Sequence, residues 1–203
     1  MKKLLVMALC VLTAVTVMAA VEINETNFPD ANFRNWVLAQ SYGQDGVLTD
    51  VEIAGVTSIS VNQKSIHSLK GIEFFTALTD LYCYWNQLTS LDVSKNTALT
   101  WLDCYSNQIK GAGMDALVQS LPTSGGSMFV IVYGYDGNVM TTTQVAAAKA
   151  KNWKVYYSDG LDWMEYAGSD PTSIEAVAAG RKADSKSGRY TSSTRLMSCS
   201  FSQ

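Results

Sequence analysis

Few side chains in this sequence have both the type and the spacing that catalysis requires. His67 is the only histidine, and it has no obvious serine or cysteine partner for nucleophilic catalysis. The motifs HExxH, GxSxG and CxxC and the phosphate-binding loop are absent from the sequence. Asp80 and Asp103 could form a carboxylate pair for glycoside hydrolysis if they stand on neighbouring strands, about 5 Å apart at Cα. An open, shallow sheet would not enclose a sugar ring or exclude water, so we predict that the chain is not an enzyme.

Asp45 and Glu52 are the candidates for a metal site, because their segment, SYGQDGVLTDVE, resembles a calcium-binding EF-hand loop. With Gly46 at the sharp sixth position, Asp45 takes the fifth position and Glu52 the twelfth. The first and third positions then hold Ser and Gly instead of carboxylates. Thr49 and Glu52 also match a capping box at the start of a helix, which needs no metal. We expect no cofactor, with calcium binding at Asp45 and Glu52 as the alternative.

Cys83 and Cys104 occupy equivalent positions in two similar segments, LYCYW and LDCYS. If these segments are adjacent strands, the two Cα atoms stand roughly 4.8 Å apart. That distance permits a disulfide, but side chains that point the same way suit one poorly. We therefore expect buried free thiols, with a disulfide as the alternative.

Aromatic side chains alternate with apolar ones in the same two segments. Alternation along a strand sends Leu81, Cys83, Leu102 and Cys104 into the core and their neighbours to the solvent-facing, concave side. Aromatic anchors with a polar rim are typical of a binding surface, although aromatic residues also favour strands for their own sake. The predicted ligand-binding residues are Asp80, Tyr82, Tyr84, Trp85, Trp101, Asp103 and Tyr105.

The segments that position these residues repeat along the chain. Leu78, Leu81, Cys83, Asn86 and Leu88 align with Leu99, Leu102, Cys104, Asn107 and Ile109, an offset of 21 residues. Leucines at this spacing, with one Asn per turn, resemble the leucine-rich repeat family, in which strand and return segment stack into a solenoid. Asn86 and Asn107 are expected to bond backbone groups in a ladder. A weaker copy begins at Val56, and its phrase LKGIEFFTA resembles the first repeat of bacterial internalin-like proteins.

Helices are expected at both ends of the repeats. Residues 24–40 and 49–55 predict two helices, and such an EF-hand-like helical cap resembles the one that covers the first internalin-like repeat. After Asn107, helical spacing of Met114, Leu117, Val118 and Leu121 predicts a helical return segment. Strand, helix and strand then follow from MFVIVYGYDG to KVYYSD, which implies a parallel βαβ unit. The predicted fold is α/β: a short leucine-rich repeat solenoid with a parallel β-sheet of about five strands, a helical N-terminal cap and a βαβ C-terminal end.

The N-terminus predicts export. Residues 1–20 have a basic start, an apolar run and a small-residue end, as in a secretory signal peptide. We assign 21–55 to the cap, 56–160 to the solenoid and 161–203 to a linker and a disordered tail. In the tail, PTSIEAV resembles the start of C-terminal sorting segments of secreted Bacteroidetes proteins, but the Gly-rich part that should follow is absent. The expected location is secreted or at the cell surface, with no stable membrane insertion once the signal is removed.

Charge and composition narrow the partners. The chain carries 15 basic and 18 acidic side chains, a net charge of −3, and no stretch collects Lys and Arg with aromatics. Nucleic acid is therefore not an expected partner. We predict an internalin-like, Bacteroidetes-type module that binds a protein or a glycan at the cell exterior through its aromatic face. The alternative is a structural spacer whose repeats carry no specific ligand.

Overall fold

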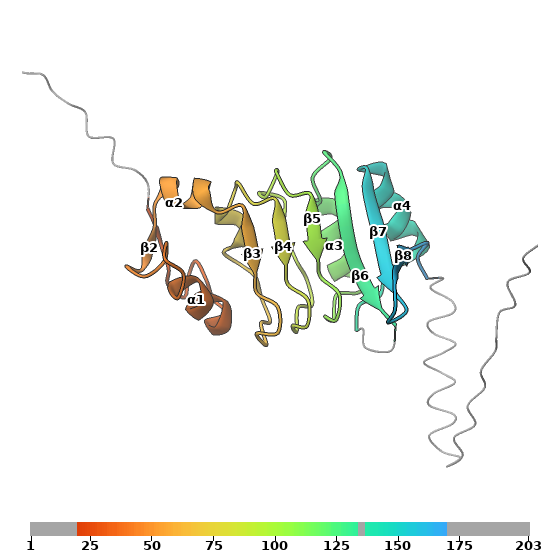
Figure 1. Ribbon diagram of the computed structural model, residues 1–203, viewed down its shortest axis with the longest axis horizontal. Coiled ribbons are helices and arrows are strands. Elements are labelled where there is room, and N and C mark those ends of the chain that lie inside the picture. The colour runs from red at the N-terminus through yellow and green to blue at the C-terminus, as the bar shows by residue number, and fades with distance from the viewer. Residues whose placement is uncertain (1–19, 134–136, 170–203) are drawn as a thin grey trace, which may run out of the picture.

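Stacked repeats form one continuous sheet along the molecule. The computed structural model describes residues 20–133 and 137–169, and Figure 1 shows the strands side by side along the longest axis. The sheet has six strands in the order β3-β4-β5-β6-β7-β8, of which β3 to β7 are parallel. These strands are β3 Ser58–Ser60, β4 Asp80–Tyr82, β5 Trp101–Asp103, β6 Gly126–Val132, β7 Trp153–Ser158 and β8 Trp163–Glu165.

The return segments cover one side of the sheet. After β3 the chain returns through the short 3-10 helix η1, Ile72–Phe74. Helix α3, Ala112–Ser120, follows β5, and α4, Thr142–Ala150, connects β6 to β7. Both helices lie behind the strands in Figure 1. The predicted helical return segment and the parallel βαβ end are therefore confirmed.

The core consists of rows that run across the strands. The ladder register aligns Ile59, Leu81, Leu102, Met128 and Val155, and all five are fully buried. Each row stacks one apolar residue per strand on the next, which is why a solenoid needs the same residue type at the same place in every repeat.

The two thiols lie in the core and are not joined by a disulfide. Cys83 and Cys104 are both fully buried and unbridged, in agreement with the expectation from the sequence. Burial raises the pKa of the Cys83 thiol far above its usual value, with a smaller contribution from the Asp103 carboxylate. Both residues therefore act as small hydrophobic groups rather than as nucleophiles.

An asparagine ladder fixes the turns that follow the strands. Asn107 donates from Nδ2 to the carbonyls of Cys83 and Cys104 at 3.0 and 2.9 Å, and its Oδ1 accepts from the Leu88 amide at 3.0 Å. Asn86 makes the same kind of bonds one repeat earlier. The structure adds a third member, Asn138, that the repeat pattern did not predict.

The N-terminal cap contains four short elements. Strands β1, Val21–Glu22, and β2, Val47–Leu48, pair antiparallel, and helices α1, Ala31–Leu38, and α2, Asp50–Gly55, complete it. The predicted capping box is present at α2. The cap packs on the first repeat through Phe28, which is fully buried and lies 5.6 and 6.5 Å from Phe74 and Phe75, between ring centroids.

A carboxylate joins the cap to the first repeat. Asp30 caps α1, and its second oxygen accepts the backbone amides of His67 and Ser68 at 2.8 and 3.2 Å. Partial burial acts to raise the pKa of Asp30, but these amide donors outweigh it, and the pKa is lowered. The His67 side chain itself is exposed, with its Nδ1 4.0 Å from Asp30.

The sheet has one strand more than the sequence suggested. About five strands were predicted, and β8 is a sixth that pairs antiparallel with β7. It lies within residues 161–203, where the sequence predicted a linker and tail. β8 has only three residues, Trp-Met-Glu, and all three are exposed. Its sequence therefore lacks the alternation of apolar and polar side chains that would predict a strand. The predicted signal peptide and most of the predicted tail lie outside the described residues.

Candidate binding surface

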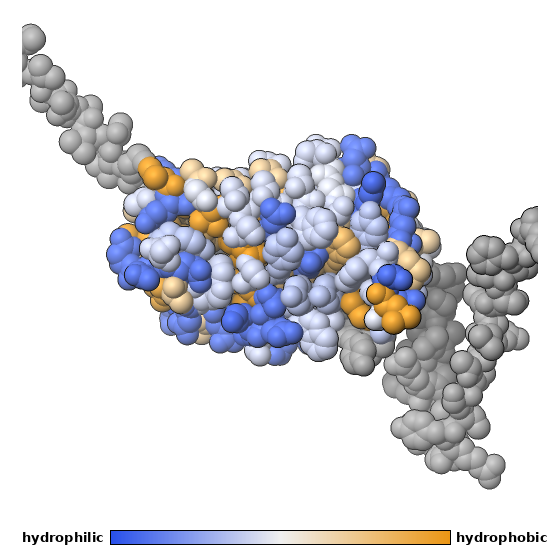
Figure 2. Space-filling view, viewed as in Figure 1, coloured by the Kyte–Doolittle hydropathy of each residue, from blue (hydrophilic) through white to orange (hydrophobic). Residues whose placement is uncertain are grey.

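The predicted ligand-binding residues gather on the side of the sheet opposite α3 and α4, which we call the open face. The register places Tyr82, Asp103, Phe129 and Tyr156 in one row across four strands, and Asp80, Trp101 and Ser127 in the row beside it. Neighbours along each strand, such as Leu81 and Leu102, point into the core. In Figure 2 the open face is mostly pale, of intermediate hydropathy, as expected of tyrosine, tryptophan and serine.

Stacked rings hold the aromatic side chains of neighbouring strands together. Tyr84 and Tyr105 stack with centroids 4.7 Å apart and an interplanar angle of 6°. Trp101 is 36% exposed and lies against Phe129, with centroids 4.7 Å apart. Trp85 is 47% exposed but lies in the turn after β4, at a φ of 55°, so it stands at the border of the surface.

Three further aromatic residues extend the surface beyond the predicted set. Phe129 stacks on Tyr156 at 4.9 Å, and Trp163 of β8 lies 4.9 Å from Phe129 and 5.2 Å from Tyr105. Alternation along the segment 126–132 could have indicated Phe129. Trp163 carried no such signal, because only the tertiary fold brings β8 back against the sheet.

Asp103 is the most unusual group on the open face. Its Oδ1 atom is buried and has no hydrogen-bond partner, while the Trp101 side chain forms a hydrogen bond with the carboxylate. Partial burial raises the pKa of Asp103 to about 6, and the Trp101 hydrogen bond opposes that rise. The group therefore remains mostly ionised at neutral pH in surroundings that favour its neutral form.

Tyr82 is next to both carboxylates of the surface, with Asp103 opposite it on β5 and Asp80 two residues before it on β4. Partial burial raises the pKa of its hydroxyl, and the charges of Asp80 and Asp103 raise it further. Asp80 accepts a hydrogen bond from the Thr79 hydroxyl at 2.6 Å. The open face thus combines aromatic rings with two negative charges.

The register corrects the predicted spacing of Asp80 and Asp103. Asp80 pairs with Trp101, and Asp103 pairs with Tyr82, so the two carboxylates are diagonal neighbours and not direct ones. From the spacing of the strands and the rise of two residues along one of them, diagonal neighbours stand about 8 Å apart at Cα, instead of the 5 Å assumed from the sequence. A bulky tyrosine or tryptophan faces each aspartate across the ladder.

The two metal candidates of the cap accept hydrogen bonds from backbone amides. The Glu52 carboxylate accepts from the amide and the hydroxyl of Thr49, both at 2.8 Å. Asp45 accepts from the amide of Val47 at 3.2 Å. Within residues 20–133 and 137–169, no three side chains of the usual metal-binding types cluster together.

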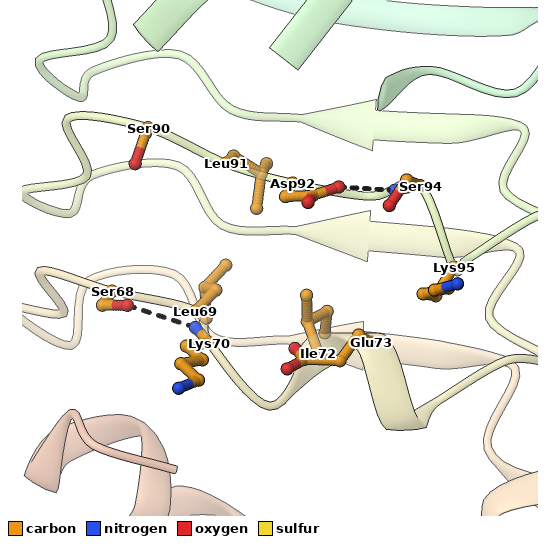
Figure 3. A pocket seen from close by; sticks show the side chains of 10 residues that line it. All are labelled: Ser68, Leu69, Lys70, Ile72, Glu73, Ser90, Leu91, Asp92, Ser94 and Lys95. Atoms are coloured by element: carbon orange, nitrogen blue, oxygen red, sulfur yellow. Dashed lines mark hydrogen bonds between the residues drawn. The ribbon is translucent and has the colours of Figure 1, made fainter. Parts of the chain in front are cut away.

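A polar pocket lies away from the aromatic surface. It has a volume of about 390 Å³ and lies between the return segments at 68–73 and 90–95. Figure 3 shows Lys70 and Glu73 on one segment and Asp92 and Lys95 on the other. Glu73 accepts from the Gly71 amide and Asp92 from the Ser94 amide, so both carboxylates stabilise their own turns. Its two lysines and two carboxylates give the pocket no excess of charge.

Comparison with known proteins supports a relationship to the internalins. No known protein-family profile matches the chain. A segment of 71 residues is 39% identical to internalin J of Listeria monocytogenes, and it represents 34% of this chain and 8% of that protein. This similarity supports internalin-like leucine-rich repeats. It covers only a small part of the length of internalin J.

Solved internalin structures from the same bacterium are similar at a coarser level. The functional domain of internalin J, described as including a cysteine ladder, matches 70% of this chain and 29% of its own, with a TM-score of 0.48 and 26% identity. Internalin C2 matches 67% and 57%, with a TM-score of 0.49 and 19% identity. Internalin F matches 73% and 41%, with a TM-score of 0.45 and 23% identity.

Proposed function

We propose that this chain is a non-enzymatic recognition module that binds a partner through the aromatic open face. The observation that carries the proposal is the continuous set of ring contacts from Tyr84, just after β4, to Trp163 on β8, which leaves Trp85 and Trp101 exposed. Trp101 lies beside both carboxylates, opposite Asp80 in the register and hydrogen-bonded to Asp103. Large, rigid aromatic groups with a polar border supply binding energy at little entropic cost.

Export to the cell exterior is part of the same proposal. The apolar N-terminal run supports a secreted or surface protein, and the segment PTSIEAV is the feature that suggests a Bacteroidetes-type bacterium. Among the described residues, no helix is long and apolar enough to cross a membrane. We also propose that the cap is a lid that needs no calcium, because Thr49 and the backbone already use Glu52.

Replacing the exposed aromatic residues tests the proposed function. The double variant Trp101→Ala, Tyr82→Ala and the wild type are screened against arrays of glycans and immobilised cell-surface proteins. We expect at least one partner of the wild type to lose binding by about tenfold or more, because truncated aromatic anchors usually cost over 1 kcal/mol each. Val51→Ala, at an exposed apolar residue of α2, is the control and should bind normally.

The spacer alternative predicts the opposite pattern. A wild type that binds nothing on either array, or a double variant that keeps every interaction while its melting temperature is unchanged, would support a structural repeat domain without a specific ligand.

A further inference from the structure

We infer that the partner of the open face is a protein that inserts an arginine side chain beside Tyr82, where the guanidinium pairs with Asp103 and Asp80. The inference rests on the proposed function and names the chemistry of the partner. Three features of the surface carry it: its one-sided charge, an unsatisfied carboxylate oxygen, and the way the rings are stacked.

The charge on this part of the open face is entirely negative. From β3 to β6 the outward positions hold serines, aromatic residues and the two carboxylates Asp80 and Asp103. The nearest basic side chain in the register is Lys154, two strands beyond Trp101 on β7. Neither aspartate forms an ion pair within the described residues. A cationic group from a partner therefore meets attraction without competition from the protein's own cations.

Asp103 has an acceptor that nothing in the described chain uses. The buried Oδ1 atom lacks a hydrogen-bond partner, and a buried acceptor without a donor costs free energy. The side chain as a whole is only partly buried, so the carboxylate can be approached from solvent although this oxygen is covered. A charged N–H donor would remove the cost and form the stronger, charge-assisted type of hydrogen bond.

Stacking covers part of the aromatic surface and leaves the ring of Tyr82 next to the carboxylates uncovered. The pairs Tyr84–Tyr105 and Phe129–Tyr156 stack nearly parallel, at 6° and 15°, so the rings of each pair cover each other's faces. Tyr82 makes no ring contact within the described residues, and its neighbour on β3 is the small Ser60. Within the described residues, no neighbouring ring therefore covers the face of Tyr82, and a flat group from a partner can stack on it.

A guanidinium meets all three conditions together. It is planar, stacks on an aromatic ring, always carries a positive charge, and donates parallel N–H bonds to a carboxylate. A lysine would satisfy the charge but would present a point charge without a flat face. Asp80, the diagonal neighbour of Asp103, supplies a second acceptor two residues before Tyr82 along β4.

A matched pair of peptides tests the inference on the full-length mature chain. A biotinylated glycine peptide with one central arginine, and its analogue with the neutral isostere citrulline, are displayed on streptavidin and titrated against the immobilised protein. We expect the arginine peptide to bind at least tenfold more tightly than the citrulline peptide, and added salt to weaken it. Asp103→Asn, and separately Asp80→Asn, should remove most of this difference. Asp92→Asn, in the polar pocket of the return segments, is the control and should preserve it.

The outcomes separate this inference from the proposed function. Equal binding of both peptides, no binding of either, or an arginine preference that survives both Asp103→Asn and Asp80→Asn would overturn the inference. If a glycan or protein from the arrays loses binding in the Trp101→Ala, Tyr82→Ala variant but not in Asp103→Asn, the proposed function stands and the arginine site is wrong. Melting curves of each variant show whether a loss of binding reflects unfolding.

Discussion

Asp103 shows how one residue can favour binding at the expense of stability. Its carboxylate lies among Tyr82, Trp101 and Phe129, with one oxygen unsatisfied, and in the described part of the chain it forms no ion pair. An isolated charge in such a place opposes folding, because water solvates it better in the unfolded chain. The same feature makes the residue ready to receive a charged donor from outside.

Removing the charge of Asp103 should stabilise the folded protein at neutral pH. The pKa is about 6 in the folded state against an ordinary value of 3.8, so the folded state binds the proton more tightly. The destabilising effect is therefore absent below pH 3.8, develops as the pH rises to about 6, and is complete above it. We expect Asp103→Asn to raise the free energy of unfolding at pH 7.5 by about 1 kcal/mol, after allowance for solvent screening.

Urea unfolding at several pH values measures this effect. The advantage of Asp103→Asn over the wild type should shrink as the pH falls from 7 to 4. Asp92→Asn serves as the control and should show no such trend. A variant that is less stable than the wild type at pH 7.5 would contradict the assignment of Asp103 as an uncompensated charge.

Asn107 is a buried residue of the asparagine ladder that fixes the turn after β5. Its side chain bonds two carbonyls and one amide in the core. In Asn107→Ala the carbonyls of Cys83 and Cys104 keep bonds from Asn86 and Asn138, but the buried Leu88 amide loses its acceptor. We expect a loss of about 2–3 kcal/mol in the free energy of unfolding. Asn35→Ala, on the exposed side of α1, should cost less than about 0.5 kcal/mol in the same denaturation assay.

At the scale of elements, the short segments are stabilised at their ends. Strands β3, β4 and β5 contain three residues each, and α2 contains six, so none of them is stable alone. Helix caps, hydrogen bonds from asparagine side chains and stacking on the neighbouring repeat supply the stability that such short elements lack on their own. For the same reason, a substitution at the end of one element should also destabilise the adjacent repeat.

The capping box of α2 gives a direct test at this scale. Thr49→Ala removes the acceptor of the Glu52 amide and one donor to the Glu52 carboxylate. We expect about 1 kcal/mol of lost stability and a correspondingly lower melting temperature. Thr97→Ala, at an exposed threonine for which no capping role is seen, should leave the melting temperature nearly unchanged. An equal loss in both variants would show that the box has no special role.

Calcium should have no effect on the cap. Because Glu52 is used by Thr49 and Asp45 by the Val47 amide, we expect millimolar calcium to leave the melting temperature of the wild type unchanged. Glu52→Gln provides the comparison. A rise in melting temperature with calcium in the wild type that disappears in Glu52→Gln would establish a metal site instead.

For the molecule as a whole, the stability of each repeat in the solenoid depends on its contacts with the adjacent repeats. Each repeat contacts only the units beside it, and the first apolar layer would face water without the cap. Phe28 fills this junction, since its ring contacts Phe33, Phe74 and Phe75. At the other end, β8 folds against β7 and brings Trp163 onto the open face.

Phe28→Ala should therefore weaken the molecule from its N-terminal end. We expect a loss of about 3–5 kcal/mol, as for other fully buried aromatic residues. Amide hydrogen exchange should rise first in α1 and β3, and last in β7, because the coupling passes only between neighbours. Phe129→Ala, in the β6 repeat, should leave the exchange of β3 unchanged. A uniform rise along the whole sheet in Phe28→Ala would indicate one cooperative unit.

The sequence by itself determined the structural features that recur in each repeat or that depend on contacts within a few residues. The leucine spacing indicated the strands, alternation assigned Leu81 and Cys83 to the core and Tyr82 to the open face, and Thr49 with Glu52 indicated the capping box. These features depend on contacts within a few residues or on a period of about 21, and both can be read along the chain.

Only the tertiary structure decided what depends on distant contacts. The ladder register put Asp80 opposite Trp101, so the two carboxylates became diagonal neighbours, both next to Tyr82. The unsatisfied oxygen of Asp103, the third ladder residue Asn138 and the return of Trp163 over the sheet also arise from packing between strands. Residue spacing does not specify the register of neighbouring strands or where the chain folds back. On this surface, the register and the return of β8 determine both the charge pattern and the shape offered to a partner.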